Sequence, residues 1–147
     1  ARSGGHASSQ TDPTVMSGIA SRQHAMTFDA ANVVVGDTDA EAHALALPQL
    51  RMMARLRGGR PLTALETVEQ AHSAEASDGL ATPLASWAAE RWFVGTADAV
   101  TERLREFATR WEVDEIMISP VAAARDSDPM DAAPARLRTL ENLATAA

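Results

Sequence analysis

The side chains best suited to acid–base or metal chemistry are few and scattered. The chain has four histidines, His6, His24, His43 and His72. None of them stands in an HxH, HxxxH or HExxH arrangement, the spacings that bring imidazoles together on one metal ion. We therefore interpret them as surface or loop histidines and predict no metal site.

Three aspartates follow one another at short intervals near the C-terminus, Asp126, Asp128 and Asp131. Their spacing superficially resembles a calcium-binding loop, but the glycine and the distal glutamate of such a loop are missing. We interpret this segment as a solvated loop after a strand. A role facing a substrate stays open, because loops at the carboxyl ends of parallel strands are where barrel enzymes bind their ligands.

Two further groups of side chains have types that suit a bound cofactor. Four arginines could reach a phosphate, although a solvated helix face or a helix-end cap explains them better: Arg51, Arg55, Arg57 and Arg60. Four aromatic residues either pack in the core or line a pocket: Trp87, Trp92, Phe93 and Trp111. Trp111 continues a helical apolar stripe, so we expect it in the core. Residues 3–9 have the composition of a phosphate loop but lack its lysine and a preceding strand, and Arg22 and His24 are no better placed for chemistry.

The composition excludes several classes of function. Of the 147 residues, 46% are hydrophobic and 22% charged, as expected of a globular domain. The net charge of −7 disfavours nucleic acid and anionic membrane surfaces as partners. No apolar run approaches the roughly 20 residues of a membrane span. The absence of cysteine excludes disulfides and thiolate metal sites, and we expect a cytoplasmic protein.

Hydrophobic periodicity predicts two strands and several helices. The strands are residues 26–35, which end in Val33, Val34 and Val35, and residues 113–120. A helix is expected from Asp39 to about residue 57, kinked or split at Pro48. Four further helices are expected, over residues 63–74, 84–90, 97–111 and 133–144, the first of them after a capping box at Thr63. Residues 91–95 are expected to form a short extended segment, and residues 121–132 a loop.

Strands that alternate with helices favour a parallel sheet of βαβ units. Two parallel strands do not make a stable sheet, since their unpaired edges need partners. We therefore expect that further strands lie either upstream of Ala1 or on another chain. We do not expect Ala1 to be the natural start of the protein. Residues 1–25 are predicted to be a flexible or partly ordered segment, and residues 26–147 to form the structured domain.

Three stretches resemble the bacterial luciferase-like flavin monooxygenases when taken together. The first is NVVVGDTDAEA at 32–42, and the second is VGTADAV at 94–100, which continues through Leu104 to VDEIMI at 113–118. The third is RLRTLENLA at 136–144. The resemblance covers roughly residues 26–147, and residues 51–59 also match. It implies that the chain is the C-terminal part of a (β/α)₈ TIM barrel, namely its last two strand–helix units with a helical insertion between them.

The resemblance also implies an activity. Members of that family use reduced FMN and O₂ to oxygenate a small organic molecule, and a deazaflavin coenzyme replaces FMN in some branches. A deazaflavin-dependent oxidoreductase, or a non-catalytic barrel remnant that binds partners, are the alternatives. The family's flavin contacts lie mostly on earlier strands, and the usual histidine after the last strand is replaced here by Ser119-Pro120-Val121. We therefore assign no catalytic or cofactor-binding residue and no metal, and we expect either a homo-oligomer or completion by missing N-terminal residues.

Overall fold

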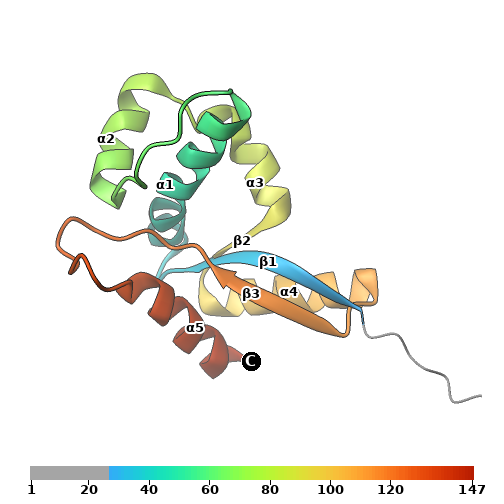
Figure 1. The fold of residues 1–147 in the computed structure, drawn as a ribbon. Helices are drawn as coiled ribbons and strands as arrows, with labels where there is room; N and C mark the ends of the chain where they lie inside the picture. Colours follow the sequence, from blue (N-terminus) through green and yellow to red (C-terminus); the bar gives the residue numbers. More distant parts are fainter. Residues whose placement is uncertain (1–26) are drawn as a thin grey trace, which may run out of the picture.

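The computed structural model describes residues 27–147, so the expected N-terminal segment and the start of the first expected strand lie outside the described residues. The elements alternate between strand and helix (Figure 1). In chain order they are β1 (Phe28–Val35), α1 (Asp39–Arg57), α2 (Val68–Asp78), the 3₁₀ turn η2 (Thr82–Leu84), α3 (Ala85–Arg91), β2 (Trp92–Gly95), α4 (Ala97–Trp111), β3 (Glu115–Pro120) and α5 (Pro134–Ala146).

The three strands form one parallel sheet in the order β2-β1-β3. In the register, Val34 of β1 lies opposite Val94 of β2, and Ala30 of β1 lies opposite Met117 of β3. The sequence predicted β1 and β3, whereas the segment expected only to be extended, 91–95, supplies the third strand. Because β1 is central, its Val33-Val34-Val35 run is buried on both faces.

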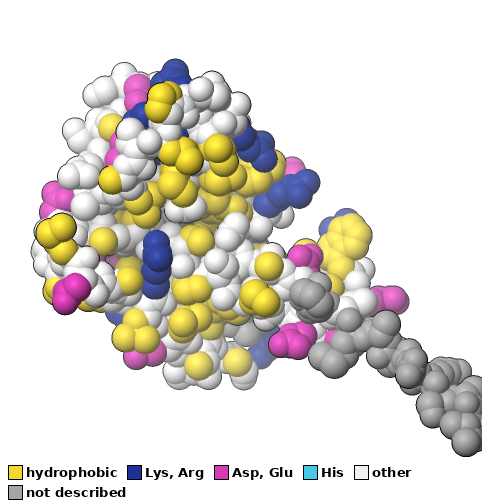
Figure 2. All heavy atoms as spheres, in the orientation of Figure 1, with side chains coloured by type: hydrophobic (Ala, Val, Ile, Leu, Met, Phe, Trp, Pro, Cys, Tyr) yellow, Lys and Arg dark blue, Asp and Glu magenta, His cyan; other side chains and the backbone are white. Residues whose placement is uncertain are grey.

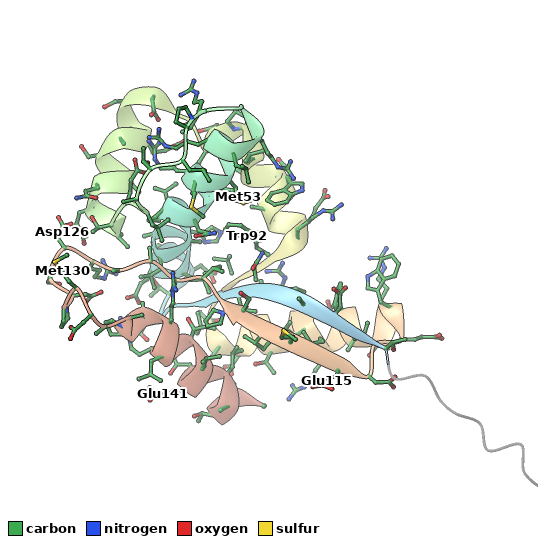
Figure 3. The ribbon with its side chains drawn as sticks, in the orientation of Figure 1. Met53, Trp92, Glu115, Asp126, Met130 and Glu141 are labelled. Carbon is green, nitrogen blue, oxygen red and sulfur yellow. The ribbon has the colours of Figure 1, made fainter. Side chains whose placement is uncertain are left out.

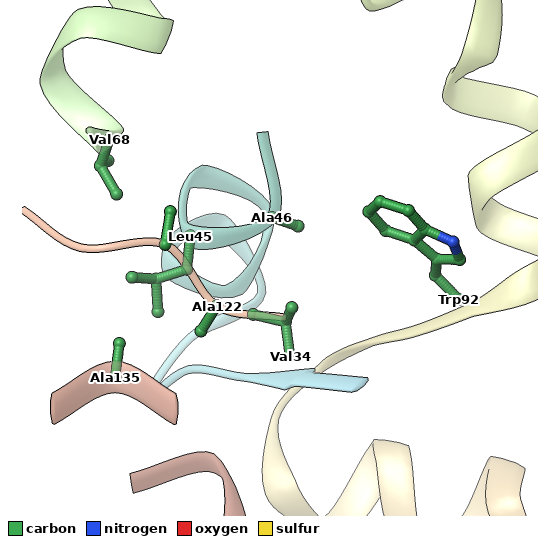
Figure 4. Packing of buried hydrophobic residues seen from close by; sticks show 8 residues of the cluster. Val34, Leu45, Ala46, Val68, Trp92, Ala122 and Ala135 are labelled. Carbon is green, nitrogen blue, oxygen red and sulfur yellow. The ribbon is translucent and has the colours of Figure 1, made fainter. Parts of the chain in front are cut away.

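Helices cover both faces of the sheet. On one face, Val34 and Trp92 pack with Leu45 and Ala46 of α1 (Figure 4), and α2 adds Val68 to the same cluster. On the other face, Val33, Val35 and Phe93 pack with Val100 and Leu104 of α4, and α5 adds Leu143. The buried members of this second cluster are Ala31, Val33, Val35, Phe93 and Val100. The connection from β1 to β2 therefore runs over one face and the connection from β2 to β3 over the other.

The prediction of the last two strand–helix units of a (β/α)₈ TIM barrel is wrong. A barrel keeps its strands in sequence order and places all its helices outside the sheet. Here the first strand lies between the second and the third, and the helices lie on both faces. The physical reason lies in the two connections, because the one from β1 to β2 and the one from β2 to β3 move in opposite directions across the sheet. Since both connections are right-handed, their helices must lie on opposite faces. The fold is a small doubly wound α/β arrangement, so the prediction holds only at the level of α/β class.

Part of one sheet face stays uncovered by the described residues. Where β1 pairs with β3, Ala30 and Ser119 are exposed, and 61% of Met117 is exposed. Hydrophobic side chains are visible around the strands and over the upper helices in Figure 2. A parallel sheet normally has both faces covered, so this part of the sheet differs from the rest, whose faces are covered by helices.

Local signals explain most helix ends. Thr38 caps α1 by accepting a hydrogen bond from the Glu41 N–H at 3.1 Å. The capping box of α2 is at Thr67 and Gln70, not at Thr63 as expected, because the chain after α1 stays irregular as far as Thr67. Pro48 lies inside α1 without splitting it. None of the helices between residues 27 and 147 has the length and apolar composition needed to cross a membrane.

Candidate functional site

A cavity of about 440 Å³ lies beside β2, between α1 and α3. Its volume is within the range of small-molecule pockets, roughly 300–1,000 Å³. It is open to solvent on one side and is lined by two helices and one strand, with one side chain from α4. The lining residues are Asp39, His43, Ala46, Leu47, Leu50, Ala85, Ala88, Ala89, Trp92, Val94 and Arg103.

Small and apolar side chains make most of the cavity wall. The Trp92 ring projects from β2 toward Ala46 of α1 (Figure 4) and is almost fully buried. Trp87 meets Trp92 edge to face, with ring centroids 6.1 Å apart, and the Arg57 guanidinium lies 4.0 Å from the Trp87 ring centroid. Of the two roles considered for Trp92, packing and pocket lining, it has both. Trp87 packs against the core cluster without lining the cavity.

His43 and Asp39 are the polar groups that α1 places at the cavity. The Nδ1 atom of His43 lies 2.7 Å from the backbone carbonyl oxygen of Asp39, one helical turn earlier. Since a carbonyl oxygen can only accept, Nδ1 carries the proton in this bond. In the neutral imidazole, Nε2 is then left with a lone pair that can accept a proton or a hydrogen bond. His43 is exposed, as its sequence context predicted, but its place beside a cavity was not foreseen.

Arg103 reaches the cavity from α4, and three of its five N–H groups are already used. It donates to the backbone oxygens of Ala89 at 3.1 Å, Trp92 at 3.0 Å and Val94 at 3.4 Å, and it lies 5.3 Å from the Phe93 ring centroid. Because β2 is an edge strand of the described sheet, its outward carbonyl groups have no neighbouring strand within residues 27–147 to pair with. Arg103 therefore closes the sheet edge, and we assign it a structural role.

The arginine group does not form a phosphate site. Arg51 is fully buried, which corrects its interpretation as part of a solvated helix face. Its Nε donates to Glu66 at 2.7 Å, and its terminal amino groups donate to Glu75 and, at 2.7 and 3.0 Å, to Asp78. Arg55 adds a weaker contact to Glu66 at 3.4 Å. The Arg51 cluster, defined as Arg51 with Glu66, Glu75 and Asp78, thus joins α1 to α2 and to the segment that precedes α2.

Two carboxylates of the Arg51 cluster, Glu75 and Asp78, favour their charged forms. The hydrogen bonds from Arg51 hold the pKa of Asp78 well below its usual range. Burial acts to raise the pKa of Glu75, but hydrogen bonds from the Ala81 N–H and from Arg51 outweigh burial, and the net shift is downward. Every donor of Arg51 that points into the cluster is thus already matched by a carboxylate.

The aspartate loop holds elements together and does not line the cavity. Asp126 accepts a hydrogen bond from the Thr67 hydroxyl, and its backbone N–H donates to Glu69 at 2.9 Å. Asp128 accepts from the Arg125 N–H at 2.8 Å, and Asp131 is exposed. Across residues 27–147, no group of three or more histidine or acidic side chains could hold a metal ion.

The other residues singled out from the sequence do not contribute to the cavity. His72 is exposed on α2. Phe93 packs on the opposite sheet face, 5.6 Å from Phe107 between ring centroids. Trp111, expected in the core, is 61% exposed and lies 5.6 Å from the Arg110 guanidinium. The following fall outside the described residues: His6, His24, Arg22 and residues 3–9.

Comparison with known proteins gives similarity in fold alone. No protein-family model and no curated protein sequence matches the chain. One solved structure, the crystal structure of apo-MsnO8, is similar with a TM-score of 0.64 and 22% sequence identity. The similarity covers 82% of this chain but 34% of the MsnO8 chain. This chain therefore spans about a third of the length of the solved structure that it matches.

The described residues do not fit the phosphate of an FMN molecule at this cavity. A phosphate requires free cationic side chains or free N–H groups at a helix start. Three of the five N–H groups of Arg103 are bonded to backbone oxygens, and the α1 start bears the acids Asp39 and Glu41. At the start of α4, a Cβ atom added to Gly95 would lie 3.2 Å from Asp39 Oδ1, so a carboxylate is already there. An anionic phosphate would meet negative charge at both helix starts.

Proposed function

We propose that this chain is part of a flavin-dependent monooxygenase similar to the bacterial luciferases, and that its cavity holds the small organic substrate. The cavity between α1, α3 and β2 is the observation on which this assignment rests. Its apolar wall suits an aliphatic or aromatic molecule. The Nε2 atom of His43, which has no hydrogen-bond partner among residues 27–147, suits a polar end group that can donate a hydrogen bond.

The motifs at 32–42, 94–100 and 136–144 support the family, and the fold shared with part of MsnO8 is compatible with it. The flavin supplies the oxidation chemistry when it is bound. In this proposal the described residues bind and orient the substrate and exclude water from it, and they do not hold the flavin phosphate. A deazaflavin coenzyme in place of FMN would leave these roles unchanged.

Filling the cavity tests the substrate assignment. Ala89 lines the cavity and its side chain is exposed, so Ala89→Phe places a ring in the cavity without disturbing the buried core. We expect binding of a straight-chain primary alcohol, whose hydroxyl can donate to His43 Nε2, to weaken by about tenfold or more when it is followed by tryptophan fluorescence. Ala76→Phe, an exposed position on α2 that does not line the cavity, is the matched control and should bind like the unchanged chain. Equal alcohol affinity in all three proteins would exclude the cavity as the site.

Flavin titration tests the division of roles. Because both helix starts at the cavity carry carboxylates that would repel a phosphate, we expect the chain alone to bind FMN weakly, with little change in flavin fluorescence. Tight FMN binding by the monomeric chain would contradict this division.

A further inference from the structure

Helix α5 has a second apolar face that nothing among the described residues covers. Ala135 and Thr139 face the sheet and are buried. On the opposite side Leu137 is 58% exposed, Leu140 is 42% exposed, and Ala144 is also exposed. The steps from 137 to 140 and from 140 to 144 are three and four residues, so these three side chains form one stripe along the helix. We call Leu137, Leu140 and Ala144 the α5 stripe.

Opposite charges border the α5 stripe on its two sides. Arg136 and Glu141 are both exposed, and neither forms an ion pair within residues 27–147. Arg136 Nε donates to the backbone oxygen of Ala122 at 3.1 Å, which orients the guanidinium. Its two terminal amino groups have no hydrogen-bond partner among residues 27–147. Figure 3 shows Glu141 pointing away from the strands.

The spacing of stripe and charges matches one heptad of a parallel two-helix coiled coil. If Leu137 is placed at heptad position a, then Leu140 falls at d and Ala144 at the next a. Arg136 then falls at g and Glu141 at the following e. In a parallel pair, g of one helix lies beside that e of the other, so Arg136 meets Glu141 of the partner subunit on both sides. In an antiparallel pair, Arg136 would meet its own copy, and the like charges would repel.

From this complementarity we propose that the α5 stripe pairs two copies of this chain in parallel. The charge pattern selects a second copy as the occupant, since the two complementary charges lie on the same helix of the same sequence. The helix is 13 residues long, so the contact is small, and small interfaces of this kind are weak and reversible. The chain should therefore pass from monomer to dimer as its concentration rises.

Sedimentation equilibrium of the full chain over a wide range of concentrations tests the interface. We expect the double variant Leu137→Ser/Leu140→Ser to weaken dimerisation by about tenfold or more, because it removes the packed apolar pair. Leu62→Ser is the matched control: Leu62 is 59% exposed but lies on the segment between α1 and α2. Circular dichroism establishes that each variant is folded. A chain that stays monomeric at every concentration, or a dimer that the double variant leaves intact, overturns the proposal.

Charge exchange tests the partner assignment without touching the stripe. Arg136→Glu alone should weaken the dimer, since the new carboxylate would face Glu141 of the partner subunit. The exchange Arg136→Glu/Glu141→Arg should restore it, because the pair is reversed but still complementary. Both variants lose the same hydrogen bond to Ala122, so its loss cannot account for a difference between them. Equal affinities in the two variants contradict the Arg136–Glu141 pairing.

Disulfide trapping tests the parallel orientation. The chain has no cysteine, so a single Ala144→Cys substitution gives one thiol per copy. In the parallel pair the two position 144 side chains face each other, and mild oxidation should give a rapid covalent dimer. Leu62→Cys serves as the control for random collision. Cross-linking at position 144 no faster than at position 62 rules out the parallel arrangement.

Discussion

At the scale of single residues, Arg51 differs most from its sequence-based interpretation. Its position near the end of a helix, with three other arginines close by, suggested a solvated or phosphate-facing side chain. The three carboxylates that bind it come from residues 15, 24 and 27 positions later. Contacts over such separations leave no local pattern, so the ion pairs could not be predicted from periodicity or spacing.

Removing the Arg51 guanidinium should destabilise the protein strongly. Arg51→Met keeps the length and the apolar stem but leaves Glu66, Glu75 and Asp78 without their shared cation. We expect the free energy of unfolding to fall by about 3 kcal/mol, the usual cost of removing one partner from a buried ion pair. The measurement is urea unfolding followed by tryptophan fluorescence.

Arg55→Met is the matched control for this experiment. Arg55 lies on the same helix but is partly exposed and makes a single ion pair, at 3.4 Å. We expect its replacement to cost less than about 1 kcal/mol. Equal losses in the two variants would contradict a special role for Arg51.

At the scale of elements, the turn from β1 into α1 depends on a close backbone approach. A Cβ atom at Gly36 would lie 2.6 Å from the Ala42 backbone nitrogen and 3.0 Å from the Thr38 oxygen. Both are backbone atoms, which cannot move aside without shifting the helix start. Gly36→Ala should therefore lower the free energy of unfolding by about 2 kcal/mol or more, in the range of overpacking.

Gly58 provides the matched control for this junction. A Cβ atom there would lie 3.2 Å from the Ala54 oxygen, at an exposed helix end that can adjust. Gly58→Ala should change thermal stability far less than Gly36→Ala. A Gly36→Ala protein with an unchanged melting temperature would show that the β1–α1 junction is looser than the described geometry.

The elements themselves were largely predictable, and their arrangement was not. Strong periodicity placed β1 within two residues of its observed start and predicted α4 with the observed ends. The four residues of β2 were too short for a period-two pattern, and their pairing with β1 depends on contacts across about 60 residues. The barrel prediction came from the family resemblance, and without β2 no strand order could be inferred from the sequence that would have contradicted it.

The candidate site follows the same rule. His43 was recognised from the sequence as an exposed histidine, and Trp92 as a residue of the core or a pocket. The cavity itself arises where α3 packs beside α1, with Ala85, Ala88 and Ala89 leaving space opposite Leu47 and Leu50. Small residues at helical spacing are compatible with any close packing, so the sequence offered no signal that distinguished a cavity from a filled interface. Trp111 shows the converse error, because a helical stripe does not reveal which of its residues the rest of the chain covers.

At the scale of the whole molecule, acidic residues both repel and stabilise. The net charge is −7 and the isoelectric point is near 5.0. Acidification toward pH 5 therefore removes general repulsion, which by itself favours the folded state. Against this, folding lowers the pKa of several carboxylates. A hydrogen bond from the Asp37 N–H is the main cause of the lowered pKa of Glu41, and one from the Asp126 N–H is the main cause for Glu69. For Glu75, hydrogen bonds outweigh the effect of burial. For Asp78, the hydrogen bonds from Arg51 are the main cause.

These lowered pKa values predict loss of stability in acid. A carboxyl group whose pKa is lower in the folded state contributes stability that is fully present above its unfolded pKa, about 4. That contribution is lost as the pH falls through the folded value, because the proton then binds more strongly to the unfolded chain. We expect the free energy of unfolding to change little between pH 7 and the isoelectric point, and then to fall steeply below about pH 4. Urea unfolding at a series of pH values measures this dependence.

Arg51→Met should make the loss of stability below pH 4 less steep, since the substitution removes the main cause of the lowered pKa of Asp78. A stability that keeps rising below pH 4 would mean that relief of repulsion outweighs the paired carboxylates.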